Sequence, residues 1–253
     1  MPEIRYVAIG DSFTEGVGDE LPDGRPRGWA DLVAEGMAAA GERVLYANLA
    51  IRGRMLDRIV GEQLEHALAL EPTVITLNGG GNDMLRPGTN AATLFTRLSG
   101  VVDRVARSGP QLVLTSGADP TAGLPMRSRI APKGDALNAL VRSLAEEHGV
   151  PFADNWSDRE LARAPYWSED RLHLGPIGHH RVAARILATL GFQHPQSWVI
   201  EAPGHVLVPG LRAELAYYRR HVLPWVQRRL TGRSSGDGRT AKLAEWSEVR
   251  PPA

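Results

Sequence analysis

Residues 5–13 read RYVAIGDSF, a short apolar run followed by Gly10, Asp11 and Ser12. A short run that is apolar on both faces is typical of a strand buried in a parallel sheet. Similar runs recur along the chain, at residues 44–47, 74–77, 112–115 and 150–153. Segments of helical apolar period separate them, near residues 28–40, 55–70, 91–107, 137–148 and 176–191. This alternation predicts a doubly wound α/β domain with a five-stranded parallel sheet.

The alternation ends near residue 191, and we expect the chain to divide there into a domain (1–191) and a C-terminal extension (192–253). The extension is predicted to be partly helical and partly flexible. Residues 211–230 form a basic helical stretch, which we expect to pack on the flank of the domain rather than bind an acidic partner. Residues 232–238 (GRSSGDG) are interpreted as a flexible linker. The extension is expected to cover the sheet edge, to shape the entrance to a site or to mediate self-association.

Composition excludes several classes of protein. The 253 residues carry 29 basic and 29 acidic side chains, so no net charge attracts nucleic acid or an anionic membrane. The lack of cysteine excludes disulfides, thiolate metal sites and a cysteine nucleophile. The sequence shows neither a signal-peptide core nor the roughly 18 consecutive apolar residues of a membrane span. We therefore expect a cytoplasmic protein that neither inserts into membranes nor binds nucleic acid.

Polar residues follow the predicted strands at their carboxyl ends, where a doubly wound sheet places its functional groups. Ser12 follows the first strand, NLAIRG (48–53) follows the second and NGGGND (78–83) follows the third. Asp170 and His173 lie in the loop before the last helix. All of these groups are expected at one edge of the sheet.

These residue types fit nucleophilic catalysis. A serine hydroxyl becomes a nucleophile when an imidazole takes its proton, and a carboxylate fixes the orientation of the ring. Ser12, His173 and Asp170 supply these three roles, and the spacing of three residues lets Asp170 reach the ring. Attack on an acyl carbonyl creates an oxyanion. We expect the backbone N–H groups of Ser12 and Gly53 and the side-chain amide of Asn82 to form its oxyanion hole.

Four separated motifs resemble those of the SGNH hydrolases, also called GDSL-type esterases and lipases. Residues 10–13 resemble the nucleophile motif, with phenylalanine where leucine is commoner. Residues 48–53 and 81–83 are similar to the second and third motifs, which carry the oxyanion glycine and asparagine, and residues 170–173 match the terminal D-x-x-H. The resemblance covers about residues 4–190. It implies a three-layer α/β/α fold of the flavodoxin-like kind, an acyl-serine intermediate, no cofactor and no large lid.

The leading interpretation is a carboxylic ester hydrolase, an esterase or deacylase for small-molecule esters with short to medium acyl groups. Trp156 and Trp167 precede the D-x-x-H motif closely enough to wall the pocket, and we expect them to bind substrate. Of His179 and His180 at the start of the last helix, one is expected to line the pocket edge and the other to face solvent.

Two other functions compete with this interpretation. In a metal-dependent phosphoesterase, Asp11, Asn82, Asp83 and His173 would act as hard-metal ligands, but the early Asp-x-His and the clustered histidines of a two-metal site are missing. We instead expect no metal, with Asp11 and Asp83 holding loop amides. The other alternative is a non-catalytic binding module on the same fold. Residues 232–236 (GRSSG) fit the G-x-S-x-G pattern, but polar flanks exclude a nucleophile elbow there.

Overall fold

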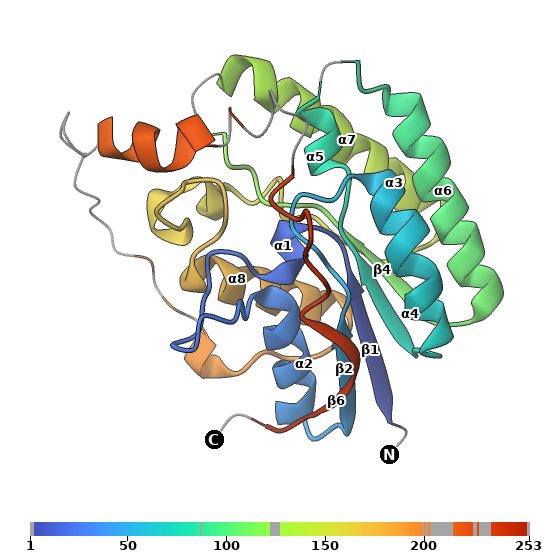
Figure 1. Ribbon diagram of the computed structural model, residues 1–253. Helices are drawn as coiled ribbons and strands as arrows, with labels where there is room; N and C mark the ends of the chain where they lie inside the picture. Colours follow the sequence, from blue (N-terminus) through green and yellow to red (C-terminus); the bar gives the residue numbers. More distant parts are fainter. Residues whose placement is uncertain are drawn as a thin grey trace.

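The computed structural model describes residues 3–86, 88–121, 127–198, 200, 202, 215–224, 227 and 234–251. Its centre is a six-stranded sheet in the order β5-β4-β3-β1-β2-β6 (Figure 1). The strands are β1 (Ile4–Ile9), β2 (Val44–Asn48), β3 (Val74–Leu77), β4 (Gln111–Thr115), β5 (Phe152–Ala153) and β6 (Leu243–Val249). β1 to β5 pair in parallel, which confirms the predicted five-stranded parallel sheet and its flavodoxin-like order.

β6 is a strand that the sequence analysis missed, so the predicted sheet is one strand too small. It pairs antiparallel with β2, with Val249 opposite Val44 and Leu243 opposite Asn48. An antiparallel edge strand can leave side chains exposed to water, and LAEWSEV (243–249) therefore lacks the continuous apolar run that marks the inner strands. The end of the extension is thus part of the central sheet.

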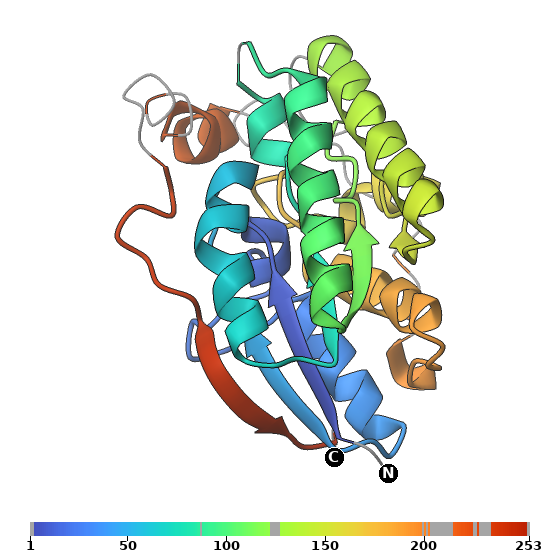
Figure 2. The ribbon, with the colours of Figure 1, turned by 90° about the vertical axis from the view of Figure 1, so that its right-hand side faces the viewer.

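Helices cover both faces of the sheet and give the predicted three layers (Figure 2). One face carries α2 (Trp29–Ala39) and α8 (Pro176–Thr189). The other carries α3 (Leu56–Arg58), η1 (Ile59–Leu64), α4 (Glu65–Ala69), α6 (Ala91–Ser108) and α7 (Arg127–His148). Tyr6 and Val7 are neighbours on β1 but belong to different core clusters, because successive strand side chains point to opposite faces. Both layers are therefore anchored on the central strand.

Two short helices begin at the carboxyl edge of the sheet, α1 (Ser12–Glu15) after β1 and α5 (Gly81–Met84) after β3. Asp11 caps α1 by accepting a hydrogen bond from the Phe13 backbone N–H (3.1 Å). The turn into α1 requires glycine at position 10, since a Cβ there would lie 2.5 Å from Thr14 Oγ1 and 2.8 Å from the Asn78 carbonyl oxygen. Further helical turns in the described residues are η2 (Arg159–Ala162), η3 (Ala164–Tyr166), η4 (Gln196–Trp198) and η5 (Tyr218–Val222).

The rest of the extension is described in parts. The predicted basic helix at 211–230 is seen at residues 215–224 and 227, which are helical, and its other residues lie outside the described part. Of the predicted linker, residues 232 and 233 also lie outside it. Residues 234–238 do not behave as a free linker, because they form a turn that packs on the domain through Ser234 and Gly236.

Candidate active site

Asp170 and His173 form a pair in the loop before α8. Nδ1 of His173 lies 2.6 Å from Oδ2 of Asp170. The other carboxylate oxygen, Oδ1, accepts hydrogen bonds from Ser168 Oγ (2.7 Å) and from the backbone N–H groups of Leu172 and His173 (2.9 Å each). These three donors fix the carboxylate, so the structure brings this predicted pair into the geometry that orients an imidazole.

The charge state of Asp170 follows from these contacts. Burial alone would raise the pKa of its carboxyl group. The hydrogen bond and charge of His173, together with the backbone N–H groups of His173 and Leu172, outweigh burial and hold the pKa well below its usual value. Asp170 is therefore ionised at neutral pH and can stabilise an imidazolium.

Ser12 and His173 belong to adjoining segments at the same edge of the sheet. The loop after α1 packs on the residue that follows His173, since a Cβ at Gly18 would lie 2.2 Å from the Leu174 carbonyl oxygen. The charge of His173 also lowers the pKa of Asp11, the neighbour of Ser12. In the described part of the chain, Nε2 of His173 has no hydrogen-bond partner, which leaves it open to accept a proton.

Gly53 lies in residues 51–54, which we call the oxyanion loop after the role predicted for Gly53. Its φ of 74° is in the left-handed region, where glycine carries no steric penalty. Glu15, the last residue of α1, binds this loop: its carboxylate accepts the Arg52 backbone N–H (2.5 Å) and the Arg52 guanidinium (2.6 and 2.8 Å). The helix that starts with Ser12 is thus joined directly to Arg52, the residue before Gly53.

Asn82 reaches the same place from α5. Its side-chain nitrogen donates to Asp11 Oδ2 and to the Arg54 carbonyl oxygen, at 3.0 Å in each case. Both amide hydrogens are therefore engaged within the protein. To donate to an oxyanion, Asn82 must exchange one of these partners, and the Arg54 carbonyl belongs to the oxyanion loop itself.

The two remaining carboxylates of these motifs hold backbone groups, as predicted. Asp11 accepts from Phe13, and Asp83 Oδ2 accepts the Leu56 backbone N–H at 2.9 Å. Burial raises the pKa of Asp11 to about 6, an effect that the Phe13 N–H and the charge of His173 oppose. Among the described residues, no three histidine, aspartate or glutamate side chains converge as a metal site requires.

Trp156 and Trp167 both donate their indole N–H to the protein. Trp156 Nε1 donates to Asp135 on α7 (2.8 Å), and its ring lies so close to Gly134 that a Cβ there would overlap it. Trp167 Nε1 donates to the Leu161 carbonyl oxygen (2.6 Å). Both side chains are half-buried, and these contacts give each of them a packing role.

His179 is fully buried and does not line an open edge. Its Nδ1 accepts the Trp29 backbone N–H (3.1 Å), and its Nε2 lies 3.4 Å from the Val17 carbonyl oxygen. Burial lowers its pKa, so the ring is neutral. His180 is half-buried. His179 therefore ties the loop after α1 to the start of α2.

Tyr217 and Ser234 of the extension reach the site, and neither was predicted. Tyr217 donates to the Asp170 carbonyl oxygen (3.2 Å), and the Arg171 guanidinium lies 4.1 Å from the centre of the Tyr217 ring. Ser234 donates to the Gly53 carbonyl oxygen (3.1 Å). Local sequence signals could not reveal these contacts, because the partners are far apart in the chain.

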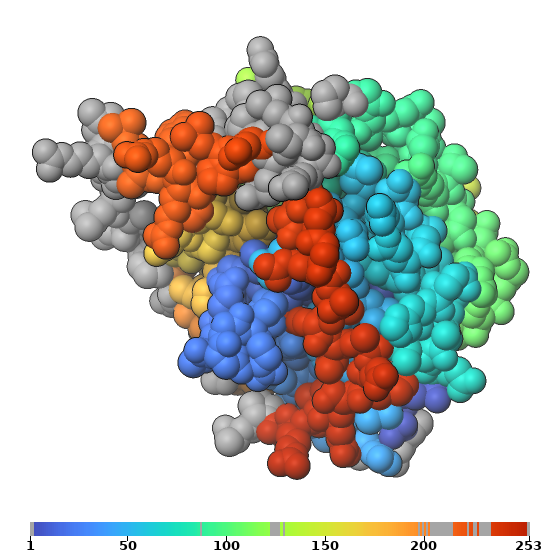
Figure 3. Space-filling model, in the orientation of Figure 1, coloured from blue at the N-terminus to red at the C-terminus, as the bar shows by residue number. Residues whose placement is uncertain are grey.

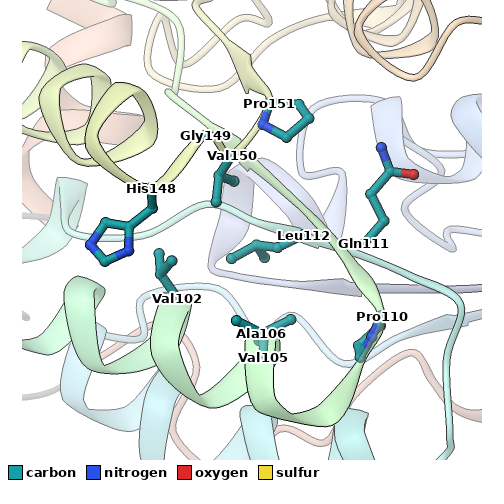
Figure 4. Close-up of a pocket in the computed structure, with 10 residues that line it drawn as sticks. All are labelled: Val102, Val105, Ala106, Pro110, Gln111, Leu112, His148, Gly149, Val150 and Pro151. Carbon is teal, nitrogen blue, oxygen red and sulfur yellow. The ribbon is translucent and has the colours of Figure 1, made fainter.

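A pocket of about 260 Å³ lies elsewhere, at the amino ends of β4 and β5 (Figure 4). Val105 of α6, Leu112 of β4 and Val150 before β5 are among its lining residues. Ser12 lies at the carboxyl ends of the strands, so this pocket is not part of the candidate active site.

The chain is similar to known proteins in sequence and in fold. The model of the GDSL-like lipase/acylhydrolase family matches residues 8–181, well over half of the chain. The chain belongs to this family. It is accordingly a carboxylic ester hydrolase, and the predicted resemblance is confirmed. Among curated proteins, the search found no match.

Solved structures share the fold of this hydrolase. A putative GDSL-like lipase from Parabacteroides merdae is 23% identical (TM-score 0.63; 75% of this chain and 96% of that chain covered). A catalytic mutant of Axe2, an acetylxylan esterase from Geobacillus stearothermophilus, is 19% identical (TM-score 0.64; 79% of this chain and 99% of that chain covered). The psychrotrophic esterase EstA from Pseudoalteromonas sp. is 16% identical (TM-score 0.60; 75% of this chain and 97% of that chain covered). Nearly all of each neighbour is covered, so this hydrolase has additional residues beyond the shared fold.

The described helices of this hydrolase include none that is both long enough and apolar enough to cross a bilayer.

Proposed function

We propose that this hydrolase is a serine esterase or deacylase that cleaves small-molecule esters with short to medium acyl groups. The observation that supports it most is the Asp170–His173 pair, whose Nε2 has no hydrogen-bond partner among the described residues. The loop of this pair packs on the loop after α1, the helix that begins with Ser12. Family membership supports ester hydrolysis in general. Beyond this, we propose Ser12 as the nucleophile, an acyl-serine intermediate and the range of acyl groups.

In the first half-reaction, Ser12 Oγ attacks the ester carbonyl carbon while its proton passes to His173 Nε2. Asp170, ionised and fixed by three donors, stabilises the imidazolium that forms. The C–O bond to the alcohol then breaks, and Nε2 returns the proton to the departing oxygen. The acyl group remains on Ser12, and the alcohol leaves.

In the second half-reaction, water attacks the acyl-serine carbonyl and gives its proton to His173 Nε2. When the bond to Ser12 breaks, Nε2 returns this proton to the serine oxygen. The products are the carboxylic acid and the original enzyme, so atoms and protons balance without a cofactor.

Donors that are already oriented before the reaction stabilise the developing oxyanion most. The backbone N–H groups of Ser12 and Gly53 are donors of this kind, because a helix start and a left-handed turn fix their directions. Asn82 is the third donor in this proposal. Its hydrogen bond to the Arg54 carbonyl is the one exchanged for the oxyanion, while its bond to Asp11 keeps the amide in place.

The test is the Ser12→Ala variant, with Ser247→Ala on the exposed part of β6 as the matched control. We expect S12A to lose turnover of p-nitrophenyl acetate and labelling by a fluorophosphonate probe, whereas S247A keeps both. Full activity of S12A would refute the proposal. Activity that disappears with EDTA and returns with Mn²⁺ would favour the metal-dependent phosphoesterase instead, and a wild type with neither activity nor labelling would favour a binding module.

The acyl range is tested separately with p-nitrophenyl esters of two to twelve carbons. We expect kcat/KM to be highest for the short and middle members. A preference for the longest ester would contradict this part of the proposal.

A further inference from the structure

Residues 234–242, which we call the C-terminal strap, run across the oxyanion loop. Figure 3 shows this segment on the surface, next to the N-terminal part of the chain. Ser234 Oγ donates to the Gly53 carbonyl oxygen at 3.1 Å. Gly236 packs so closely on the loop that a Cβ at this position would lie 2.0 Å from the Arg52 carbonyl oxygen. The strap therefore contacts the peptide groups on both sides of Gly53.

The contact with Arg52 bears on the direction of the Gly53 N–H. The Arg52 carbonyl and the Gly53 N–H belong to the same planar peptide group and point in opposite directions. A contact that fixes the carbonyl also fixes the N–H. Gly236 and Ser234 limit rotation of the two peptide groups that flank Gly53, and Glu15 holds the loop from the side of α1.

Lys242 anchors the other end of the strap beneath α1. Its ammonium donates to the backbone oxygens of Glu15 (2.7 Å), Pro26 (3.0 Å) and Arg27 (2.6 Å), and it pairs with Asp31 (2.5 Å). The Lys242 side chain is 14% exposed. Because Glu15 binds Lys242 with its backbone carbonyl and Arg52 with its carboxylate, the strap, α1 and the oxyanion loop form one hydrogen-bonded unit.

We propose that the C-terminal strap is a positioning element of the active site, with Ser234, Gly236 and Lys242 as positioning residues that hold the Gly53 N–H toward the reacting carbonyl. This inference rests on the proposed serine esterase function. It gives part of the extension a role in the reaction, although the strap lies outside residues 8–181, which the family model matches.

The test compares Ser234→Ala with Ser234→Thr, which keeps the hydroxyl, and with Ser247→Ala as the matched control. Active sites are counted with a fluorophosphonate probe, so that kcat is obtained per working site. We expect S234A to lower kcat about fivefold, the effect of one neutral hydrogen bond, with KM within about twofold. S234T should restore most of kcat, and S247A should match the wild type.

A steric variant tests the same contact independently. Gly236→Ala places a methyl group against the Arg52 carbonyl, and we expect kcat to fall about tenfold or more, toward the loss of an oxyanion donor. Gly100→Ala on α6 is the control, because nothing lies within 4 Å of a Cβ there.

The outcomes separate the two proposals. If S12A is inactive but S234A and G236A keep the wild-type kcat per active site, the strap proposal is wrong and the serine mechanism stands. A loss that appears only as fewer active sites would also overturn it, since the strap would then serve stability alone. If S12A keeps its activity, the serine mechanism fails and the strap proposal fails with it.

Discussion

The Asp170→Asn substitution tests the role of the carboxylate with little disturbance of the loop. Three donors, Ser168 Oγ and the backbone N–H groups of Leu172 and His173, face Oδ1 at 2.7 to 2.9 Å. In the variant, the amide oxygen must take this position, because an NH₂ group there would face three donors. The NH₂ group is then placed against His173 Nδ1.

This orientation sets the size of the effect. Because the NH₂ group of the new asparagine donates, Nδ1 of His173 must accept, and the ring proton moves to Nε2. A protonated Nε2 can no longer accept the proton of Ser12. The same substitution in a serine protease triad lowers kcat about 10⁴-fold, equivalent to about 5.5 kcal/mol in the barrier. Because the three contacts on the Oδ1 side remain, we expect the free energy of unfolding to fall by only about 1 to 2 kcal/mol.

The assay is p-nitrophenyl acetate turnover, with urea unfolding to measure stability. Asp158→Asn is the control, because it makes the same change from carboxylate to amide in another aspartate, which pairs with Arg181 (2.7 Å). We expect D158N to keep kcat within about threefold of the wild type. A D170N enzyme that is folded and keeps kcat within tenfold of the wild type would refute the assigned role of Asp170.

Three further predictions concern neighbouring groups. Asn82→Ala should lower kcat about 10²- to 10³-fold with a smaller change in KM in steady-state kinetics, and an unchanged kcat would exclude Asn82 as an oxyanion donor. Glu15→Gln should lower kcat per active site with little change in KM, because a neutral amide holds the Arg52 guanidinium less tightly. Equal kcat in the variant and the wild type would show that the charged contact between Glu15 and Arg52 is dispensable. Burial lowers the pKa of His179 in the folded state, whereas in the unfolded state the ring has the ordinary histidine pKa of about 6.5. Below pH 6.5 the unfolded state therefore binds more protons than the folded state. Stability should therefore fall as pH decreases from 6.5, by at most about 1.4 kcal/mol per pH unit from this residue, and urea unfolding of His179→Gln should show a weaker dependence. An identical pH dependence in the variant would contradict this.

The sequence allowed the parallel sheet to be predicted because each inner strand is a short run that is apolar on both faces. The same rule placed Ser12, Gly53 and Asn82 at one edge, since the carboxyl ends of parallel strands meet there. β6 lacked this signature because an edge strand can expose part of its surface. Its pairing with β2 joins segments about 200 residues apart, as Val249 with Val44, and local patterns carry no information at that distance.

The contacts around the oxyanion loop were unpredictable for a related reason. Glu15 and Arg52 lie in two different motifs, and their pairing depends on how the loop turns after β2. Lys242 is one of many basic residues, and nothing in its neighbours marks it as buried. Ser234 lies in a stretch whose glycine-rich composition is typical of a linker. Such polar contacts are decided by the folded arrangement of the chain rather than by local sequence.

The central claim is that Ser12 is the nucleophile and carries the acyl group. The most direct measurement is intact-mass and peptide mass spectrometry of the full chain after reaction with a fluorophosphonate probe, alongside residual activity. We predict one adduct per molecule, located on Ser12, with activity lost in proportion to labelling and no adduct in His173→Ala over the same time. An adduct on another residue, or full activity in a fully Ser12-labelled protein, would contradict the account.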